Sequence, residues 1–263
     1  MNALPTLAFA LILAAAAVEA AFLLRRGSRK DPASHWILLA AAAALLAWEV
    51  DRSVEIGFPA LTGAFESLVF YALALCLVGF AYRVQRRTPF LPAALFGGTL
   101  AAAILLAVAS SPIAPKAALA PIPALRSGWL ALHVAFSFVG EAFFVISFVA
   151  ATCFLASRDE ARRLEYDRLA YVAVGIGYPV FTAGALVFGA IWAQRAWGTW
   201  WSWDPKETWA LVTWLVYTFY LHLRLTRRRS GRLPAWVAVI GFACTLFTFF
   251  GVNYLLPGLH SYG

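Results

Sequence analysis

The sequence predicts an all-helical protein that crosses a membrane several times, and three observations support this fold class. Hydrophobic residues make up 62% of the 263 residues and charged residues only 13%, a composition that no water-soluble domain of this length tolerates on its surface. The apolar residues form runs close to the length of about 20 residues that a bilayer-spanning helix needs. The basic residues gather in alternate loops between these runs. We therefore expect one integral membrane domain over residues 1–263, a helical bundle of about eight transmembrane helices.

The eight runs define the expected spans in chain order. The first run is followed by basic residues instead of preceded by them, the reverse of a signal peptide, so we interpret it as a retained span. The second is the weakest, because Glu49, Asp51, Arg52 and Glu55 crowd its end. The spans lie near residues 5–24, 36–56, 64–82, 90–109, 129–156, 167–193, 207–225 and 233–255.

Proline and glycine mark two irregular places. The segment from Ser110 to Ser127 contains four prolines and is expected to be a loop before the fifth span. Within the sixth span, Gly175, Gly177 and Pro179 predict a kink, because proline removes a backbone hydrogen bond and clashes with the preceding turn. A kink there would open a cavity for a cofactor, although glycine and proline are also common in ordinary membrane helices.

The distribution of basic residues predicts the orientation. Sixteen of the 21 Lys and Arg residues lie in the loops after spans one, three, five and seven, and five lie on the opposite side. Because cytoplasmic loops carry the excess of Lys and Arg, both termini are expected on the outer, periplasmic side. The Trp-rich loop between helices six and seven is then expected on that side too. The net charge of +8 is explained in this way, so we exclude nucleic acid as a partner.

The cysteines exclude two classes of protein. Cys76, Cys153 and Cys244 are isolated within apolar segments, and the chain has neither a C-x-x-C pair nor a C-x-x-C-H haem-attachment motif. The chain is therefore neither a dithiol oxidoreductase nor a c-type cytochrome by this signal.

Tryptophans are concentrated in one place. Seven of the eleven fall between Trp192 and Trp214. Tryptophan favours membrane interfaces, which accounts for Trp36, Trp48, Trp129 and Trp236. The density within the segment 195–209 exceeds what anchoring requires and suits a large planar anionic cofactor, for which haem is the first candidate. The expected platform consists of Trp197, Trp200, Trp201 and Trp203.

Charged residues follow these tryptophans directly. Lys206 or Arg195 can pair with a haem propionate, and Asp204 and Glu207 complete the candidate binding residues. The same residues also read as a helix start, with Asp204 as N-cap, proline in the first turn and Glu207 near the positive end of the helix dipole. Both interpretations stay open for Asp204.

The four histidines divide by position. His133 lies near the outer end of the fifth span and His260 beyond the eighth, so both can approach the Trp-rich loop and supply the two axial ligands of a haem iron. His222 lies roughly 22 Å deeper along the seventh helix than Glu207 and is either an interfacial residue or a ligand at a second, inner site. His35 shares that inner side and is most simply an interface residue.

Buried carboxylates within spans are functional candidates by default. Glu141 lies about two turns beyond His133, and its partner is not evident from the sequence. Glu19 and Glu49 lie near span ends, where reaching toward water is the simpler interpretation.

These motifs carry a resemblance to a known family. The run from Trp197 to Arg224, WGTWWSWDPKETWALVTWLVYTFYLHLR, resembles the signature of the CcsA (also ResC) family of cytochrome c biogenesis membrane proteins. The segments 125–133 and 251–263 resemble those that carry the family's two outer histidines, and 65–68 resembles a further element, although Gly63 and Ala64 depart from the family's usual pattern before it. Residues 1–57 match mainly in hydropathy.

The resemblance implies a function and a set of ligands. His133 and His260 would be axial ligands of haem b at the outer face, and His222 a ligand of an inner site completed by a partner subunit of the CcsB (ResB) type or by His35. With that partner, and served by a thiol-reductant pathway, the chain would bring haem from the cytoplasmic side. It would present the haem for thioether attachment to the C-x-x-C-H motif of apocytochrome c. It would thus be a subunit of a holocytochrome c synthase, a haem lyase, in a bacterial inner membrane or a thylakoid membrane, in contact with membrane lipid.

Other functions stay open. A haem carrier or exporter without synthase activity needs the same platform and ligands, and a b-type electron-transfer subunit also uses paired histidines. A regulatory membrane protein without haem chemistry is a further alternative, against which the intact Trp-rich loop argues. No acid–base pair is clearly dedicated to catalysis, so no catalytic residue is assigned.

Overall fold

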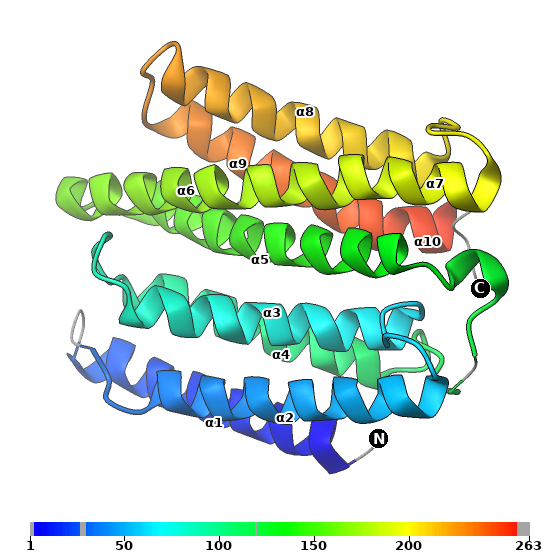
Figure 1. Ribbon diagram of the computed structural model, residues 1–263. Coiled ribbons are helices and arrows are strands. Elements are labelled where there is room, and N and C mark those ends of the chain that lie inside the picture. The colour runs from blue at the N-terminus through cyan, green and yellow to red at the C-terminus, as the bar shows by residue number, and fades with distance from the viewer. Residues whose placement is uncertain (1–2, 27–29, 119, 257–263) are drawn as a thin grey trace. The chain divides into compact units, whose positions relative to one another are not determined.

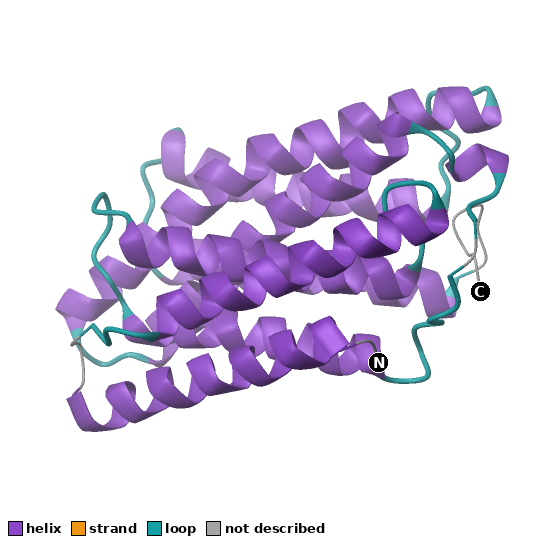
Figure 2. Ribbon diagram, turned by 60° about the horizontal axis from the view of Figure 1, so that its bottom comes forward, coloured by secondary structure: helices purple, strands orange, loops and turns teal. Residues whose placement is uncertain are grey.

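The computed structural model describes residues 3–26, 30–118 and 120–256, and within these ranges the chain contains helices and no strand (Figures 1 and 2). The predicted all-helical fold is confirmed. The chain divides into two compact units, unit 1 (residues 1–126) and unit 2 (residues 127–263). The prediction of a single domain stays a prediction.

Unit 1 is a bundle of four antiparallel helices. Each helix packs against the next, and the fourth packs back against the first. Its interior contains many small side chains, such as the fully buried Ala8, Ala15 and Ala41, beside Leu45 and Leu68. Small residues let helix backbones approach closely. In a membrane, lipid is as apolar as the side chains, so helices associate through this close packing and not through the hydrophobic effect. The helices are α1 (Ala3–Arg26), α2 (Ser34–Ile56), α3 (Ala64–Val84) and α4 (Pro92–Ser110), followed by a short 3₁₀ turn, η1 (Pro123–Leu125).

Unit 2 is built from four long helical rods, two of which contain a π-helical segment. The rods are α5 (Gly128–Ala156); α6 (Glu160–Phe181), the π-helix η2 (Thr182–Phe188) and α7 (Gly189–Trp197); α8 (Pro205–Leu225); and α9 (Arg232–Leu246), the π-helix η3 (Phe247–Gly251) and α10 (Val252–Leu255). Helix α5 packs against the rods that begin with α6 and α9, and α8 also packs against these two rods.

Glycines allow α5 to approach the second rod of unit 2 closely. A Cβ at Gly140 would lie 2.7 Å from the backbone nitrogen of Phe181, and a Cβ at Gly177 would lie 2.8 Å from the carbonyl oxygen of Gly140. Gly175, by contrast, has no heavy atom within 4 Å of its Cβ position. Gly177 therefore lets α5 and α6 pack closely. The sequence pattern predicted only a kink at this glycine.

The irregularity predicted in the sixth span lies after Pro179. The α-helix passes through Pro179, and the π-helix begins three residues later, at Thr182. π-helical turns within α-helices are frequently found at functional sites.

One ion pair fixes the end of unit 2 at which α6 begins. Arg224, in the last turn of α8, donates from Nη1 to both carboxylate oxygens of Asp167 on α6, each at 2.7 Å. Asp167 also accepts from the backbone N–H of Gly231 at 3.2 Å. Both side chains are 11% exposed, so this pair is screened less than a surface ion pair. It joins α6, α8 and the turn before α9.

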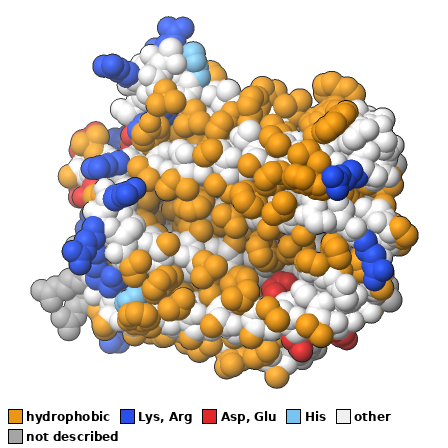
Figure 3. Space-filling view, in the orientation of Figure 1, with side chains coloured by type: hydrophobic (Ala, Val, Ile, Leu, Met, Phe, Trp, Pro, Cys, Tyr) orange, Lys and Arg blue, Asp and Glu red, His pale blue; other side chains and the backbone are white. Residues whose placement is uncertain are grey.

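Six helical rods of the described chain are long and apolar enough to cross a membrane: 3–25, 64–84, 92–110, 128–156, 160–197 and 232–255. Hydrophobic side chains cover much of the surface in Figure 3, and the Lys and Arg side chains lie mainly toward its edges. Each of the eight predicted spans overlaps one helical rod of the described chain, although the sixth rod (160–197) begins seven residues before its predicted start, and the count of eight crossings, with those of α2 and α8, stays a prediction. Charged residues at the end of α2 and at the start of α8 lower their hydropathy.

Candidate functional site

His133 lies in the second turn of α5 against the rod that contains η2. Its ring stacks on that of Trp192, with 6.3 Å between centroids and 11° between planes. Its Nδ1 lies 2.9 Å from the carbonyl oxygen of Gly184. A carbonyl oxygen only accepts, so Nδ1 is the protonated nitrogen, and in the neutral ring the lone pair belongs to Nε2. Metal-binding histidines are commonly oriented in this way by a second hydrogen bond.

Two glycines make this arrangement possible. A Cβ at Gly184 would overlap the backbone of α5 at Phe136 and Ser137, and a Cβ at Gly189 would lie 3.0 Å from Nδ1 of His133. The backbone N–H of Gly189 also donates to the Gly184 carbonyl across the π-helical turn. The imidazole is thus held in a slot that only glycine at both positions leaves open.

The Trp-rich segment 195–209 is a loop only in part. Residues 195–197 end α7, residues 205–209 begin α8, and the loop between them, the Trp loop, comprises residues 198–204. Gly198 ends α7 with φ of 77°, the left-handed C-cap conformation that glycine favours. Trp203 also has a positive φ, of 59°, which is unusual for a bulky residue and is often found at functional sites.

The tryptophans of the platform differ in exposure. Trp200 and Trp203 are 60% and 68% exposed, whereas Trp197 and Trp201 are half-buried. Trp201 packs edge-to-face on Trp203 at 5.9 Å, and Trp197 does so on Trp192 at the same distance. Through Trp192, the aromatic contacts run from His133 to Trp197.

Asp204 and Glu207 form the start of α8. Asp204 accepts from the backbone N–H of Lys206 at 2.9 Å, and Glu207 accepts from the backbone N–H and the hydroxyl of Ser202 at 2.7 and 3.1 Å. The helix-start interpretation of Asp204 is therefore confirmed as a structural role. Both carboxylates hold the Trp loop against α8.

Lys206 points into unit 2 instead of toward the Trp loop. Its ammonium donates to Oδ1 of Asn253 on α10 at 3.2 Å, and its charge attracts the carboxyl group of Glu141 on α5. Glu141 is 6% exposed, and its Oε2 has no hydrogen-bond partner. The hydrogen bond from Lys206 to Asn253 joins α8 to α10 and competes with the predicted contact to a propionate, whereas Glu141 keeps an unsatisfied oxygen among the described residues.

Arg195 is better placed than Lys206 to pair with a propionate. It is exposed at the end of α7, with its guanidinium 5.6 Å from the centroid of the Trp129 ring on α5. Close by in sequence, Nε1 of Trp197 and Nε1 of Trp201 are buried donors without a hydrogen-bond partner in the part of the chain that the structure describes. Buried N–H groups are normally satisfied, so these two donors fit a ligand that brings acceptor oxygens. The residues present therefore fit a planar anion such as haem.

Of the other described histidines, His222 does not join this group and His35 belongs to unit 1. His222 is exposed in the last turn of α8, at the opposite end of unit 2 from the Trp loop. His35 begins α2 in unit 1, where it is buried and packs against Trp36 and Phe80. His260 lies outside the described residues.

Four residues that position the site were not among the predicted site residues. Trp192 was counted among the clustered tryptophans but not assigned to the platform, and Gly184, Gly189 and Asn253 received no role. A polar amide within an otherwise apolar span is a signal that points to Asn253, whereas nothing in the local sequence pattern distinguishes Gly184 and Gly189 from other glycines of membrane helices.

Comparisons with known proteins identify relatives over most of the chain. The family model described as "Cytochrome C assembly protein" matches residues 61–260. Proteins named "Cytochrome c biogenesis protein CcsA" are similar to this chain in Guillardia theta (35% identity, 81% of this chain and 79% of the relative) and in Chlamydomonas reinhardtii (37%, 86% and 65%). The one in Prochlorococcus marinus strain MIT 9303 is 33% identical over 99% of this chain and 93% of its own.

The fold is shared with a solved structure. The structure named "Cytochrome c Heme Lyase CcmF" matches 97% of this chain with a TM-score of 0.71 and 17% identity. This chain spans 46% of that protein's length. At this identity the likeness shows the fold alone.

Proposed function

The chain belongs to the cytochrome c assembly protein family and takes part in cytochrome c maturation, and we propose that it does so by holding haem against the Trp loop for transfer to apocytochrome c. The observation that carries this proposal is the hydrogen bond from His133 Nδ1 to the Gly184 carbonyl. It directs the lone pair of the neutral ring to Nε2, the state that an axial iron ligand requires. His260 would supply the second axial ligand.

Each part of the site has a task in this proposal. The exposed rings of Trp200 and Trp203 cover an apolar face of the macrocycle, and the buried Nε1 donors of Trp197 and Trp201 bind propionate oxygens together with Arg195. Asp204 and Glu207 fix the loop that carries these rings.

The chemistry proposed for attachment is addition of thiols to alkenes. Haem supplies two vinyl groups; each cysteine S–H of the C-x-x-C-H motif adds across one of them, so that sulfur bonds one vinyl carbon and hydrogen the other. No group in the site is needed to break a strong bond, so the chain contributes mainly by positioning. Held geometry raises the effective concentration of the reacting groups.

We further propose the orientation and the partner. The excess of basic residues in alternate loops supports a periplasmic or lumenal Trp loop. The exposed position of His222, at the end of unit 2 opposite the Trp loop, supports an inner ligand completed by a CcsB-type subunit. The family resemblance supports haem b as the bound form.

The test is the haem content of the chain purified with its CcsB-type partner. We expect haem by the pyridine haemochrome assay in the wild type, a loss or altered spectrum in His133→Ala and in His260→Ala, and recovery with added imidazole. If both variants keep the wild-type content and spectrum, the proposed ligands are wrong. Adding an apocytochrome then separates a synthase, which forms covalent cytochrome, from a carrier, which does not.

A further inference from the structure

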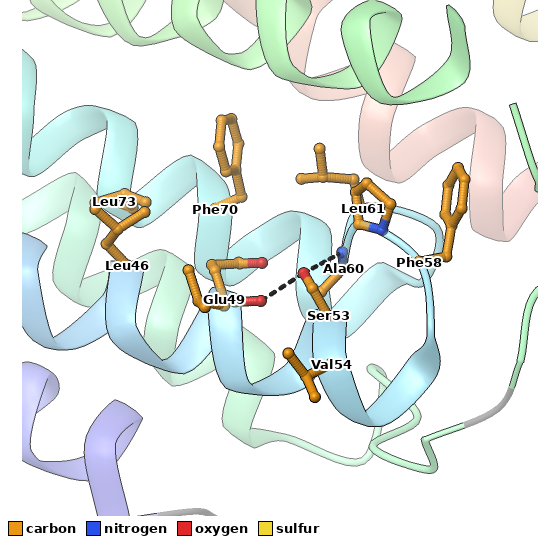
Figure 4. Close-up of a pocket in the computed structure, with 11 residues that line it drawn as sticks. Leu46, Glu49, Ser53, Val54, Phe58, Ala60, Leu61, Phe70 and Leu73 are labelled. Carbon is orange, nitrogen blue, oxygen red and sulfur yellow. Dashed lines mark hydrogen bonds between the residues drawn. The ribbon is translucent and has the colours of Figure 1, made fainter. Parts of the chain in front are cut away.

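A pocket in unit 1 lies between the last turns of α2, the segment 57–63 and α3 (Figure 4). Its volume is about 470 Å³, within the range of small-ligand sites. The walls are almost entirely apolar, and Val50 and Val54 on α2 are 58% and 77% exposed. In a membrane these exposed side chains contact hydrocarbon. The lining includes Leu46, Val50, Val54, Phe58, Phe70 and Leu73.

One carboxyl group lines this apolar pocket. Glu49 is 7% exposed and lies among Phe70, Leu61 and Ser53 in Figure 4. Its Oε1 is buried and has no hydrogen-bond partner. The other polar side chain of the lining, Ser53, is satisfied, because its hydroxyl donates to the Glu49 carbonyl and accepts from the N–H of Ala60. The carboxyl group that lines the pocket therefore contains a buried acceptor that nothing in the described chain satisfies.

Arg52, the cation near Glu49 in sequence, already binds other groups. Arg52 donates from Nε and Nη2 to Oε1 of Glu66 at 3.0 and 2.9 Å, and from Nη1 to Glu55 at 3.0 Å. Its Nη2 also donates to the Lys116 carbonyl at 2.7 Å. One guanidinium thus binds the exposed Glu55 and the buried Glu66, and within the described chain it makes no hydrogen bond to the buried Glu49. A buried carboxylate is stable only with a cation or a proton, so a cation bound in the pocket would compensate Glu49.

We propose that the pocket binds the ammonium headgroup of an ethanolamine phospholipid. The primary ammonium donates to Glu49 and supplies the missing charge, and an acyl chain lies along the apolar wall of α2. Lys116 is exposed at the same end of unit 1, where its carbonyl accepts from Arg52 and its ammonium donates to the Ser110 carbonyl at 2.7 Å, and this ammonium would also neutralise the phosphate. A choline headgroup has the charge without an N–H donor, and a glycerol headgroup has neither the charge nor a compensating amine.

The test is native mass spectrometry of the full-length chain purified in detergent. The protein is mixed with equal amounts of ethanolamine, choline and glycerol phospholipids that have the same acyl chains. We expect the wild type to retain the ethanolamine lipid with a preference of about tenfold, because hydrogen bonds to charged groups are worth a tenfold ratio or more. Glu49→Gln, which keeps the shape, should abolish that preference. Asp51→Asn, on the exposed face of the same helix, should keep it.

Three results would overturn the proposal: no headgroup preference in the wild type, the same preference in Glu49→Gln, or its loss in Asp51→Asn. If Glu49→Gln does not fold, Leu46→Trp carries the test, because a ring added to the half-exposed pocket wall fills the space for the acyl chain. It should lower retention of the ethanolamine lipid at unchanged melting temperature. Unchanged retention would contradict the proposal. Haem content is not part of either measurement, so failure here leaves the proposed haem site untouched.

Discussion

Gly189→Ala should displace His133 without removing any atom of it. The added Cβ would lie 3.0 Å from Nδ1 and 3.2 Å from Cε1 of the imidazole. Ordinary contacts between such atoms begin near about 3.5 Å, so the ring must move by roughly 0.5 Å. That movement weakens the 2.9 Å hydrogen bond from Nδ1 to the Gly184 carbonyl, which contributes about 1 kcal/mol to the free energy of unfolding.

The effect on haem should exceed the effect on folding. Losing the hydrogen bond that orients a metal-binding histidine typically costs about 10- to 100-fold in metal affinity. We therefore expect haem affinity to fall by about that factor, while the melting temperature changes little, because alanine is also the better helix former by about 1 kcal/mol. The assay is a haem titration followed by absorption of the chain with its partner subunit, alongside a thermal melt.

Gly175→Ala is the matched control, since Gly175 lies in the same helical rod and has open space at its Cβ position. It should leave haem affinity unchanged. Haem affinity of Gly189→Ala within twofold of the wild type, or an equal loss in the control, would refute the positioning argument.

Three further substitutions test other contacts. Lys206→Met should destabilise unit 2 by about 1–3 kcal/mol, because it removes the hydrogen bond from α8 to Asn253 on α10 and leaves that amide oxygen without its donor, and Asn253→Leu should cost less in the Lys206→Met background than in the wild type in a thermal melt; additive losses would mean that the two groups are not coupled. Gly63→Ala should destabilise unit 1 by about 1–3 kcal/mol, because its Cβ would overlap the carboxylate that Arg52 binds, whereas Gly128→Ala, with open space, should be neutral; equal melting temperatures for the two would contradict this. Arg195→Gln should weaken haem binding in the haem titration by about tenfold if its guanidinium pairs with a propionate, and an unchanged titration would remove Arg195 from the site.

The positions of the helices could be predicted from the sequence because each depends on a long local pattern. Apolar runs of about 20 residues, ended by charges and prolines, located the eight rods. The N-cap at Asp204 was also readable, since a cap involves only residues within one turn.

The direction of individual side chains could not be predicted in the same way. The sequence places Lys206 next to the Trp loop, but the orientation of its side chain depends on Asn253, which is distant in the chain. The contact of His133 with Gly184 likewise depends on how closely α5 crosses η2, which small residues permit but do not specify. Tertiary packing therefore sets the orientation of both side chains.

The π-helix η2 sets the rotational register of α7 relative to α5. One α-helical residue corresponds to a rotation of about 100° and a rise of about 1.5 Å. Deleting a single residue between Thr182 and Phe188 would let this stretch close into a regular α-helix and turn everything beyond it by that angle. Trp192 and Arg195 would then leave the side of the rod that faces His133. The length of this segment is therefore as strict a requirement for the site as the identity of its ligands, and insertions or deletions of one residue here should be tolerated far less than substitutions.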